Sequence, residues 1–471
     1  MIAAISDWAP ELVRDRAAAT LHNQLTAAIV GAVEQGALRV GTRLPPHRIL
    51  AHRLGVSVQT VGLSYKEAER LGYLRSEVGR GTFVQHRASA RPDRFVLDRN
   101  PTDLIDLSIV RAVYTERHEA AARALLRAMA EDDNGAWMRP CRPVAGLDRH
   151  RAAAALWLRR LGVDAPVERI LITNGAAQAI FIALATVIQP GDLVLTEELT
   201  DHGAIGLASV LGFTVRGLAT DAEGVLPDAF AAACSAARVK ALVTIPTFGN
   251  PARYLASAAR RAETAAIAER HGVFVIEDEV FKPLLDEPLP AMSAMVPDLG
   301  FFATSFTKSV LTGLRTGYLV VPARFAIRAA SILRVSSWSA VPLAAEMATR
   351  WIENGEAEAL LGVQRAEIAA RQAILAETLG PAIVNSHSYA PSAWVALPEH
   401  WTEEGLTRTL FARGVAVTPS DPFLAGTSQS AGGIRVCLGG HLSHERLRVA
   451  LEIVRQTLAQ LAPVNDAGLI G

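Results

Sequence analysis

The segment FFATSFTK, residues 301–308, ends an apolar run with Lys308, one of only four lysines among 471 residues. Beside these lysines the chain holds 43 arginines. A guanidinium keeps its charge, whereas a desolvated lysine amine loses its proton more readily and condenses with an aldehyde. An ordinary surface lysine is the alternative interpretation. The neighbours of Lys308 in the sequence favour a reactive amine.

Two polar residues accompany Lys308. Ser305 lies three residues before it and Arg315 lies seven residues after it. A hydroxyl, an amine and a fixed guanidinium on one strand-to-loop passage suit an aldehyde cofactor that also carries a phosphate. A Ser-x-x-Lys pair also occurs in penicillin-binding enzymes, but the Ser-Asp-Asn and Lys-Thr-Gly elements of that site are absent from this sequence. The serine-nucleophile alternative is therefore weak.

Apolar runs before this segment predict the fold of the larger part of the chain. Strands are expected at 169–173, 193–196, 241–245 and 273–276, with helices such as 256–271 between them. Strands without polar alternation are buried on both faces, as in parallel sheets. We therefore expect an α/β fold in which ligand groups follow the strand ends.

Polar residues stand where these predicted strands end. Thr173–Gln178 joins a strand to a helix, and the amides of Gly175, Ala176 and Ala177 at that helix start are suited to a phosphate. Asn250 follows the next-but-one strand, and Asp278 follows the last one at a depth where a carboxylate needs a cationic partner. Each of these residues could also be an ordinary turn residue or helix cap. Together with Ser305, Lys308 and Arg315 they form one constellation.

The composition limits the classes of protein to consider. With 50% apolar and 20% charged residues, the chain buries a large core and is expected to hold two or three domains. Its longest apolar region, 170–190, is interrupted by polar residues, so no membrane span is expected, and the polar N-terminus predicts no secretory signal. Three widely spaced cysteines without metal-ligand spacing predict neither disulfides nor a metal site, and they fit a reducing cytoplasm. No G-x-G-x-x-G is present, which disfavours a nicotinamide or flavin site.

The front of the chain is basic although the whole chain is neutral. From residue 13 to residue 87 it holds eleven Lys and Arg residues and five Asp and Glu residues, an excess of six positive charges. A phosphate-binding module uses such an excess, although a solvated basic face is equally compatible with charge alone. The pattern of elements in this region decides between the two.

The front elements predict a helix-turn-helix followed by a hairpin. One helix carries Leu21, Leu25, Ile29 and Val33, a second is expected over 47–54, and Ser57 caps a third. The buried face of this third helix is expected to comprise Val58, Val61, Tyr65, Ala68 and Leu71. Residues 73–84 are typical of a wing, a hairpin with a Gly-Arg-Gly tip.

Short polar residues near the start of the third helix suit contacts with base edges. These are Ser57, Gln59, Thr60 and Ser64, and Lys66 further along can reach a phosphate. The region resembles the winged helix-turn-helix of GntR-type regulators over about residues 13 to 86. That resemblance implies that Arg48 and Arg80 contact phosphate or the minor groove, while Ser57, Gln59 and Thr60 lie in the major groove of double-stranded operator DNA.

The later constellation resembles the fold-type I pyridoxal phosphate enzymes, the aspartate aminotransferase superfamily, over about residues 106 to 462. The resemblance implies that Lys308 forms the internal aldimine with pyridoxal 5'-phosphate and that Asp278 pairs with the pyridine nitrogen. Asn250 then donates to the ring hydroxyl. The phosphate is held by Ser305, Arg315 and the amides of Gly175, Ala176 and Ala177. Arg435, in Gly433–Val436, matches the arginine that binds a substrate carboxylate.

A winged helix joined to an aminotransferase-like body resembles the MocR subfamily of GntR-type transcriptional regulators. The implied fold classes are an α+β winged helix-turn-helix at 13–86 and an α/β fold-type I domain at 105–465, joined by a linker at 87–104. The second domain is expected to have a mainly parallel central sheet and a smaller C-terminal subdomain. The subfamily also implies a head-to-tail homodimer.

Three positions depart from the superfamily pattern. Asp201 stands where a tyrosine usually stacks on the cofactor ring, although His202 beside it is aromatic, and Phe281 stands where a tyrosine usually contacts the ring hydroxyl. Cys141 replaces a tyrosine that binds phosphate in many relatives. Cofactor binding survives these losses better than turnover does, because the lost phenol helps to tune the cofactor for catalysis.

Three functions remain to be compared. The sequence favours a DNA-binding regulator that senses an amino acid or related amine through pyridoxal phosphate, without sustained turnover. The alternatives are an active aminotransferase with an appended DNA-binding domain, and a regulator whose body serves only for dimerisation. The sequence leaves open the effector, the operator, the regulated genes, activation or repression, and residual transamination.

Overall fold

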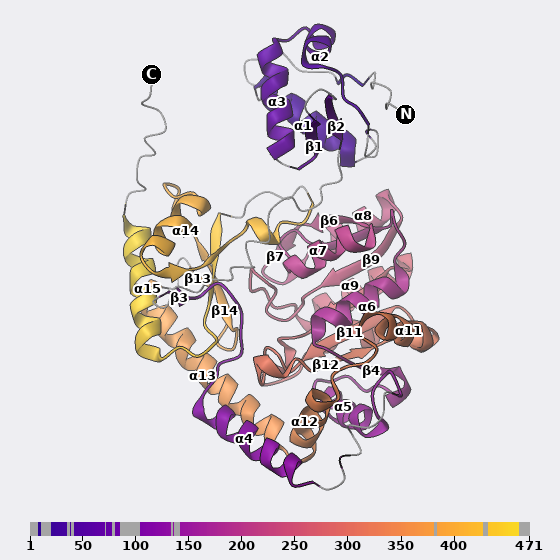
Figure 1. The fold of residues 1–471 in the computed structure, drawn as a ribbon, viewed down its shortest axis with the longest axis vertical. Coiled ribbons are helices and arrows are strands. Elements are labelled where there is room, and N and C mark those ends of the chain that lie inside the picture. The colour runs from indigo at the N-terminus through magenta and orange to yellow at the C-terminus, as the bar shows by residue number, and fades with distance from the viewer. Residues whose placement is uncertain are drawn as a thin grey trace. The chain divides into compact units, whose positions relative to one another are not determined.

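The computed structural model describes residues 8–10, 20–34, 38, 42–70, 72–77, 81–84, 104–132, 135, 142–380, 384–426 and 432–460. The chain divides into two compact units, Met1–Arg99 and Asn100–Gly471 (Figure 1). The division falls within the segment 87–104, for which the sequence predicts a linker. None of the described helices is long and apolar enough to cross a membrane.

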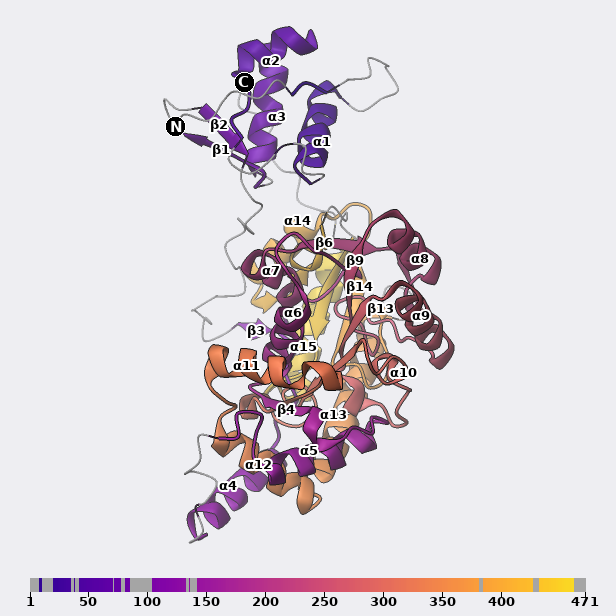
Figure 2. The same ribbon diagram turned by 90° about the vertical axis from the view of Figure 1, so that its right-hand side faces the viewer.

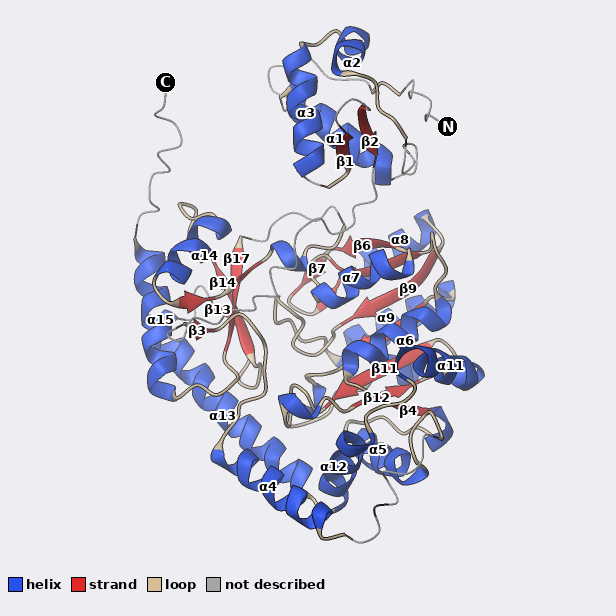
Figure 3. Cartoon of the chain, in the orientation of Figure 1, coloured by secondary structure: helices blue, strands red, loops and turns tan. Residues whose placement is uncertain are grey.

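The first unit contains three helices and a hairpin. The helices are α1 (Leu21–Glu34), α2 (His47–Leu54) and α3 (Val58–Arg70), and β1 (Leu74–Glu77) pairs antiparallel with β2 (Gly81–Val84) (Figure 3). All five elements contribute to one apolar core, which includes Leu25, Ile29, Leu50, Val61 and Tyr65. The predicted helix-turn-helix and hairpin strands are therefore present, while the hairpin tip at 78–80 and Leu71 lie outside the described residues.

Two side chains of α3 differ from the prediction. Val58 is 47% exposed instead of buried, because a side chain at the first helical position leans back over the preceding turn and away from the core. Ser64 is buried and donates to the carbonyl oxygens of His22 at 3.0 Å and Thr60 at 2.9 Å. Ser64 therefore ties α3 to α1 and does not face a base edge.

The second unit is built on a seven-stranded sheet. Its strand order is β4 (Ile170–Thr173), β12 (Gly317–Val320), β11 (Gly300–Ser305), β10 (Phe274–Asp278), β9 (Val239–Thr244), β5 (Leu193–Glu197) and β6 (Thr214–Leu218). Only β12 runs antiparallel to its neighbours in this sheet. The predicted mainly parallel sheet is thus confirmed.

Helices cover both faces of the sheet, as Figure 2 shows. The helices α6 (Ala176–Val187), α7 (His202–Leu211) and α11 (Ala326–Ser337) share one core with Val194 and Ile276. The helices α8 (Pro227–Ala236), α9 (Ala258–His271) and α10 (Met292–Met295) share the opposite core with Leu195 and Val275. Successive strand residues therefore enter opposite cores, which explains the unbroken apolar runs in the sequence.

A smaller lobe follows the large sheet. Its antiparallel strands are β13 (Val384–Asn385), β14 (Ser392–Ala396), β17 (Gly433–Cys437) and β16 (Thr418–Pro419), and its helices are α13 (Glu356–Leu379), α14 (Glu403–Ala412) and α15 (His444–Ala459). The strand β3 (Ile105–Asp106) pairs parallel with β15 (Val415–Ala416), so the first described residues of this unit belong to the smaller lobe. The other elements are α4 (Glu116–Ala130), α5 (Asp148–Arg160), α12 (Pro342–Glu353), β7 (Thr220–Asp221), β8 (Gly224–Val225) and short 3-10 helices at Val167–Arg169, Lys282–Leu284, Thr312–Leu314, Ala323–Phe325 and Asp421–Phe423.

Six strands of the large sheet end at the same edge. β5, β6, β9, β10 and β11 are parallel, and β4 has the same direction because both β4 and β11 run antiparallel to β12. In register, Ser305 lies opposite Gly317, which lies opposite Thr173. The residues that follow these strand ends are therefore brought together.

A buried charged network supports β10 beneath this edge. Arg261 of α9 lies 2.5 Å from the Glu279 carboxylate and 3.5 Å from the Glu277 carboxylate, and Lys282 lies 3.5 Å from Glu279. All four side chains are fully buried. Glu277 also accepts hydrogen bonds from the backbone amides of Met292 and Ser293, both at 3.0 Å. The network fixes the residues on either side of Asp278 and thereby fixes Asp278.

Replacing Arg261 with alanine should destabilise the protein strongly. The change leaves two buried carboxylates without their guanidinium, and breaking a buried pair in this way costs about 3–5 kcal/mol. The comparison is Arg260→Ala, which removes the adjacent arginine and its partly exposed pair with Asp221 at 2.8 Å, worth about 1 kcal/mol or less. Urea unfolding measures both variants. Equal losses of stability would contradict the role given to the network.

Candidate functional site

Lys308 follows β11 at the edge where the strands end. Its Nζ atom donates to the carbonyl oxygen of Val110 at 2.5 Å. Burial lowers the pKa of Lys308, and the charges of Arg435 and Arg315 act in the same direction, whereas Asp201 opposes them. A lowered pKa increases the fraction of neutral amine, which is the form that attacks an aldehyde.

Asp278 is a buried carboxylate at the end of β10, with 7% of its surface exposed. Within the described residues its carboxylate forms no ion pair, and its hydrogen bond comes from the Val280 amide at 3.3 Å. Burial raises the pKa of Asp278 to about 8, and the nearby charge of Asp201 adds to the effect. No described side chain is therefore the cationic partner that the sequence predicts for this carboxylate. A cationic group of a bound cofactor, such as a protonated ring nitrogen, would supply that partner.

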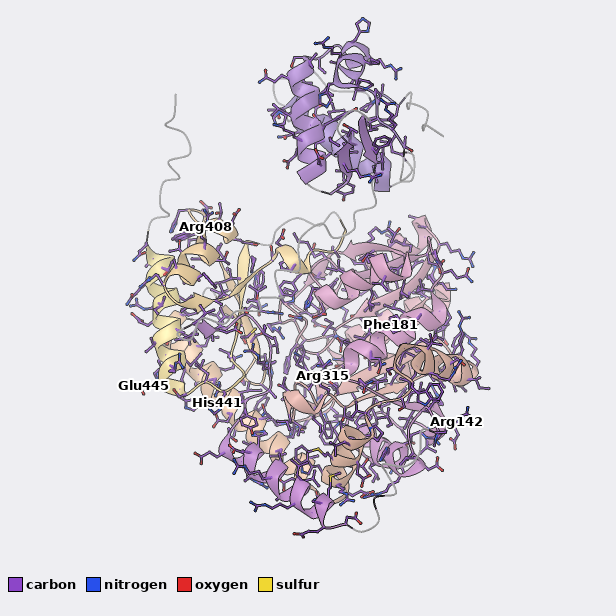
Figure 4. All side chains as sticks on the ribbon, in the orientation of Figure 1. Arg142, Phe181, Arg315, Arg408, His441 and Glu445 are labelled. Carbon is purple, nitrogen blue, oxygen red and sulfur yellow. The ribbon has the colours of Figure 1, made fainter. Side chains whose placement is uncertain are left out.

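The predicted phosphate ligands meet around the start of α6. Gly175 precedes this helix at φ 86°, and Ala176 and Ala177 are its first residues, whose amides have no acceptor within the helix. A Cβ atom on Gly175 would lie 3.1 Å from Nη2 of Arg315, so the guanidinium lies against this glycine. Ser305 is buried at the end of β11. Figure 4 labels Arg315 in the middle of the larger unit.

Asn250 joins the large sheet to the smaller lobe. Its Nδ2 atom donates to Oδ2 of Asp201 at 2.8 Å. Its Oδ1 atom accepts from Nη1 of Arg435 on β17 at 2.8 Å and from Nη2 of Arg253 at 3.0 Å. The structure thus brings Asn250 and Arg435 into direct contact. Arg253 is a third partner that sequence reasoning missed, since an isolated arginine in a loop carries no pattern.

Asp201, which departs from the superfamily pattern, accepts two hydrogen bonds from nearby residues. It caps α7 by accepting from the Gly203 amide at 2.8 Å, in addition to its bond from Asn250. Burial favours the neutral acid, but the charge of His202 and the Gly203 amide outweigh it and lower the pKa of Asp201. The residue is therefore a carboxylate that orients Asn250.

Of the other two departures from the superfamily pattern, only Phe281 lies within the described residues. Phe281 is buried, and the guanidinium carbon of Arg253 lies 5.2 Å from the centre of its ring. An arginine side chain thus lies near the Phe281 ring. Cys141 lies outside the described residues.

Backbone carbonyls of residues 104–114, called the strap below, complete the site. The Val110 carbonyl accepts from Lys308 at 2.5 Å and the Ser108 carbonyl accepts from Nη2 of Arg435 at 2.6 Å. The Ala112 amide donates to Thr312 Oγ1 at 2.9 Å. A cavity of about 270 Å³ is lined by Arg111–Tyr114 of the strap together with Leu311–Gly313, Gly440 and His441. Sequence reasoning missed the strap because carbonyls carry no residue signature.

The donor set fits pyridoxal phosphate. The fit rests on a buried carboxylate without a cation, a helix start with free amides beside an arginine, and a lysine with a lowered pKa. The carboxylate and the helix-start amides are incompletely satisfied by the described chain, and the amine loses its proton more readily than usual. They match the ring nitrogen, the phosphate and the aldehyde of that cofactor in turn.

The residues predicted to contact DNA lie mostly on the surface of the first unit. Arg48, Ser57, Gln59 and Lys66 are exposed and Thr60 is half-buried. The Ser57 hydroxyl accepts from the Thr60 amide at 2.9 Å, as expected of the residue that caps α3. Arg80 lies outside the described residues.

The sequence matches two family models and several curated proteins. Residues 102–454 match the family aminotransferase class I and II, and residues 21–84 match the bacterial regulatory proteins of the gntR family. The uncharacterized HTH-type transcriptional regulator YdeF of Bacillus subtilis is 28% identical over 455 residues, which cover 96% of this chain and 97% of that protein. The probable rhizopine catabolism regulatory protein MocR of Rhizobium meliloti is 28% identical over 347 residues, 67% of this chain and 68% of that protein.

Solved structures share the fold of the larger unit. An archaeal alanine:glyoxylate aminotransferase superposes with a TM-score of 0.69 at 20% identity, covering 75% of this chain and 90% of that one. Similarity at this level of identity establishes the fold. The fold-type I architecture expected for the second unit is therefore confirmed.

Asp278 gives the cofactor-free protein a defined dependence on pH. Its folded pKa, about 8, lies above its ordinary value of 3.8, so the folded state retains a proton that the unfolded state releases, and stability falls as pH rises between these values. Relative to the parent protein, Asp278→Asn should therefore gain stability across this window, by up to about 1.4 kcal/mol per pH unit.

Urea unfolding at several pH values between 5 and 8 measures this gain. Asp221→Asn serves as the control, since the Arg260 pair lowers the pKa of Asp221 and this carboxylate is ionised in both states throughout the window. A stability difference for Asp278→Asn that does not change with pH would show that Asp278 is not protonated in the folded protein.

Proposed function

We propose that this transcriptional regulator of the MocR type binds pyridoxal phosphate and senses an amino acid or a related amine. The chain belongs to the aminotransferase class I and II family and carries a gntR-type region in front of the aminotransferase-like part. The observation that carries the proposal is the set of incompletely satisfied groups around Lys308. The effector is an amino acid or a similar amine, and the response is a change in DNA binding.

When bound, pyridoxal phosphate supplies an aldehyde that condenses reversibly with amines. Lys308 would hold the cofactor through its amine, and Asp278 would supply the negative charge for the ring nitrogen. Asn250 would bind the ring hydroxyl. Ser305, Arg315 and the amides of Gly175, Ala176 and Ala177 would hold the phosphate, and Arg435 would hold the acid group of the effector.

A sensor is favoured over an enzyme by the residues on the reactive side of the site. Phe281 has no hydroxyl to place beside the cofactor, and Asp201 is engaged with Asn250 and the start of α7. The second candidate, an active aminotransferase, draws its support from the full set of cofactor ligands. Sustained conversion of an amino acid to its keto acid by the purified protein would establish that alternative.

The first unit supplies the DNA contacts in this proposal. The N-terminal end of α3, with Ser57, Gln59 and Thr60, enters the major groove. Lys66 contacts a phosphate, and Arg48 and Arg80 contact phosphate or the minor groove. The protein acts as a head-to-tail homodimer on two half-sites of an operator. Because a DNA-binding regulator acts where the DNA is, we place it in the cytoplasm.

The strap offers a route by which the ligand site affects the DNA-binding unit. Its carbonyls at Ser108 and Val110 accept hydrogen bonds from Arg435 and Lys308, the two groups that an acid-bearing amine engages. A ligand that takes these donors leaves the strap with fewer contacts. The strap follows the predicted linker, so its release shifts the population of arrangements available to the DNA-binding units.

Lys308→Ala should abolish cofactor attachment. The purified parent protein should show the visible absorbance of bound pyridoxal phosphate, and borohydride reduction followed by peptide mapping should locate the cofactor on the Lys308 peptide. The control is Lys240→Ala, which removes another of the four lysines from a position on β9 and should retain the absorbance. A colourless parent protein, or an adduct on a different peptide, overturns the assignment.

The same variant separates sensing from DNA binding. Lys308→Ala should bind DNA selected from a random library with the affinity of the parent protein, because the first unit is unchanged, but amines should no longer alter that affinity. Fluorescence anisotropy of labelled DNA measures both properties. An undiminished response to amines in the variant would remove the cofactor from the switch.

Replacing Lys66 with alanine should weaken DNA binding with little change in sequence preference. The loss of one phosphate contact should reduce the slope of log affinity against log salt concentration by about one. Gln59→Ala is the matched comparison, since it should change base preference and leave the slope intact. A slope that is the same in Lys66→Ala and in the parent protein argues against a phosphate contact at Lys66.

A further inference from the structure

Two buried guanidinium groups donate to one oxygen atom. Arg435 and Arg253 bind Oδ1 of Asn250 at 2.8 Å and 3.0 Å, and each side chain is only 3% exposed. The Nε atom of each arginine is buried and has no hydrogen-bond partner among the described residues. Buried donors are normally satisfied, so both side chains have hydrogen-bonding capacity that the described part of the chain leaves unused.

The guanidinium groups of Arg253 and Arg435 lie 5.2 Å and 4.5 Å from the ring centres of Phe281 and Phe423, but neither is paired with a carboxylate within the described residues. The nearest carboxylate in the network, Asp201, is reached only through Asn250. Burial and the charge of Arg435 lower the pKa of Arg253 to about 9, so its guanidinium still carries a charge at neutral pH. Two like charges in a buried position are costly unless an anion joins them.

The backbone at Arg253 adds an independent observation. Its φ angle is 65°, in the left-handed region that glycine adopts freely and that other residues adopt at a cost in free energy. A side chain retained at such a position offsets that cost by some other contribution. The alternative role for Arg253 is to hold the loop in shape, because its Nη1 atom donates to the Phe248 carbonyl at 2.9 Å.

We propose that Arg253 joins Arg435 in holding the acid group of the effector, so that part of the site's preference for acid-bearing amines depends on Arg253. This inference rests on the proposed function and assigns Arg253 a role in ligand selection. A carboxylate has two oxygens and about four acceptor positions, enough to take N–H groups from both arginines at once. Such charge-assisted bonds are stronger than neutral ones.

Arg253→Gly is the sharpest variant for a test. It removes the guanidinium and replaces it with the residue best suited to the backbone angle, so the loop is expected to keep its shape. Arg253→Lys retains a positive charge and serves as the conservative variant. The control is Arg371→Gln, which removes a buried guanidinium that donates to the Leu438 and Leu442 carbonyls at 2.7 Å and 2.6 Å, outside the candidate site.

Matched pairs of amines provide the first measurement. Cofactor-loaded protein is titrated with L-alanine and ethylamine, and with L-phenylalanine and phenethylamine, and binding is followed by absorbance and calorimetry. The parent protein should prefer the acid-bearing member of a pair. Arg253→Gly should bind that member about 10- to 100-fold more weakly, the loss expected for one hydrogen-bonded charged partner, and should bind the other member unchanged.

Arg253→Lys should lie between the parent protein and Arg253→Gly, and Arg371→Gln should match the parent protein. An equal loss for both members of a pair would mean that Arg253 only shapes the loop, and no loss would mean that it does not contact the ligand. Either result overturns the proposal, as does a parent protein without preference for the acid-bearing member.

Cofactor-free protein provides the second measurement. Maleate, an acid without an amine, should raise the thermal unfolding midpoint of the parent protein and of Arg371→Gln, but not that of Arg253→Gly. Maleate stabilisation that is equal in all variants, or absent from the parent protein, contradicts a paired-arginine site. A protein that takes up no cofactor but responds to maleate as described would refute the proposed function and leave the acid-binding site intact.

Discussion

The candidate site depends on the hydrogen bonds of one amide side chain, Asn250. Its nitrogen donates to Asp201 at the start of α7. Its oxygen accepts from Arg435 of the small sheet and from Arg253 of its own loop. The two bonds to the oxygen are buried and the bond to Asp201 is partly buried, and in such surroundings an unmade hydrogen bond costs more than a made one contributes. The two lobes of the body therefore form one site only while Asn250 is held in this orientation.

The sequence was sufficient for the parts of the site that follow from strand ends. Lys308, Asp278, Asn250 and Ser305 were identifiable because unbroken apolar runs predict parallel strands, whose carboxyl ends meet at one edge. The capped start of α3 was predictable in the same way from Ser57. Residue type and position were enough in each case.

The remaining features depend on contacts between distant segments. The carbonyls of Ser108 and Val110 belong to the backbone, so no residue type marks them, and the left-handed conformation of Arg253 has no counterpart in its neighbours. Val58 and Ser64 were misjudged because helical periodicity does not specify where a helix end leaves the core or which side chain reaches the adjacent helix. The predicted roles of the cofactor and DNA residues stay predictions, whereas the structure places all of these residues except Arg80 in the fold.

The strap sets how the site meets a ligand. In the free body, Nζ of Lys308 and Nη2 of Arg435 already donate to carbonyls of the strap. A tethered acceptor has a high effective concentration, which does not vary with the amount of protein. An incoming amine must outcompete it, so part of the intrinsic binding energy is spent on displacement and the apparent affinity is lower than the pocket alone would give. The length and stiffness of the strap therefore help to set the concentration of amine at which the site becomes half-occupied.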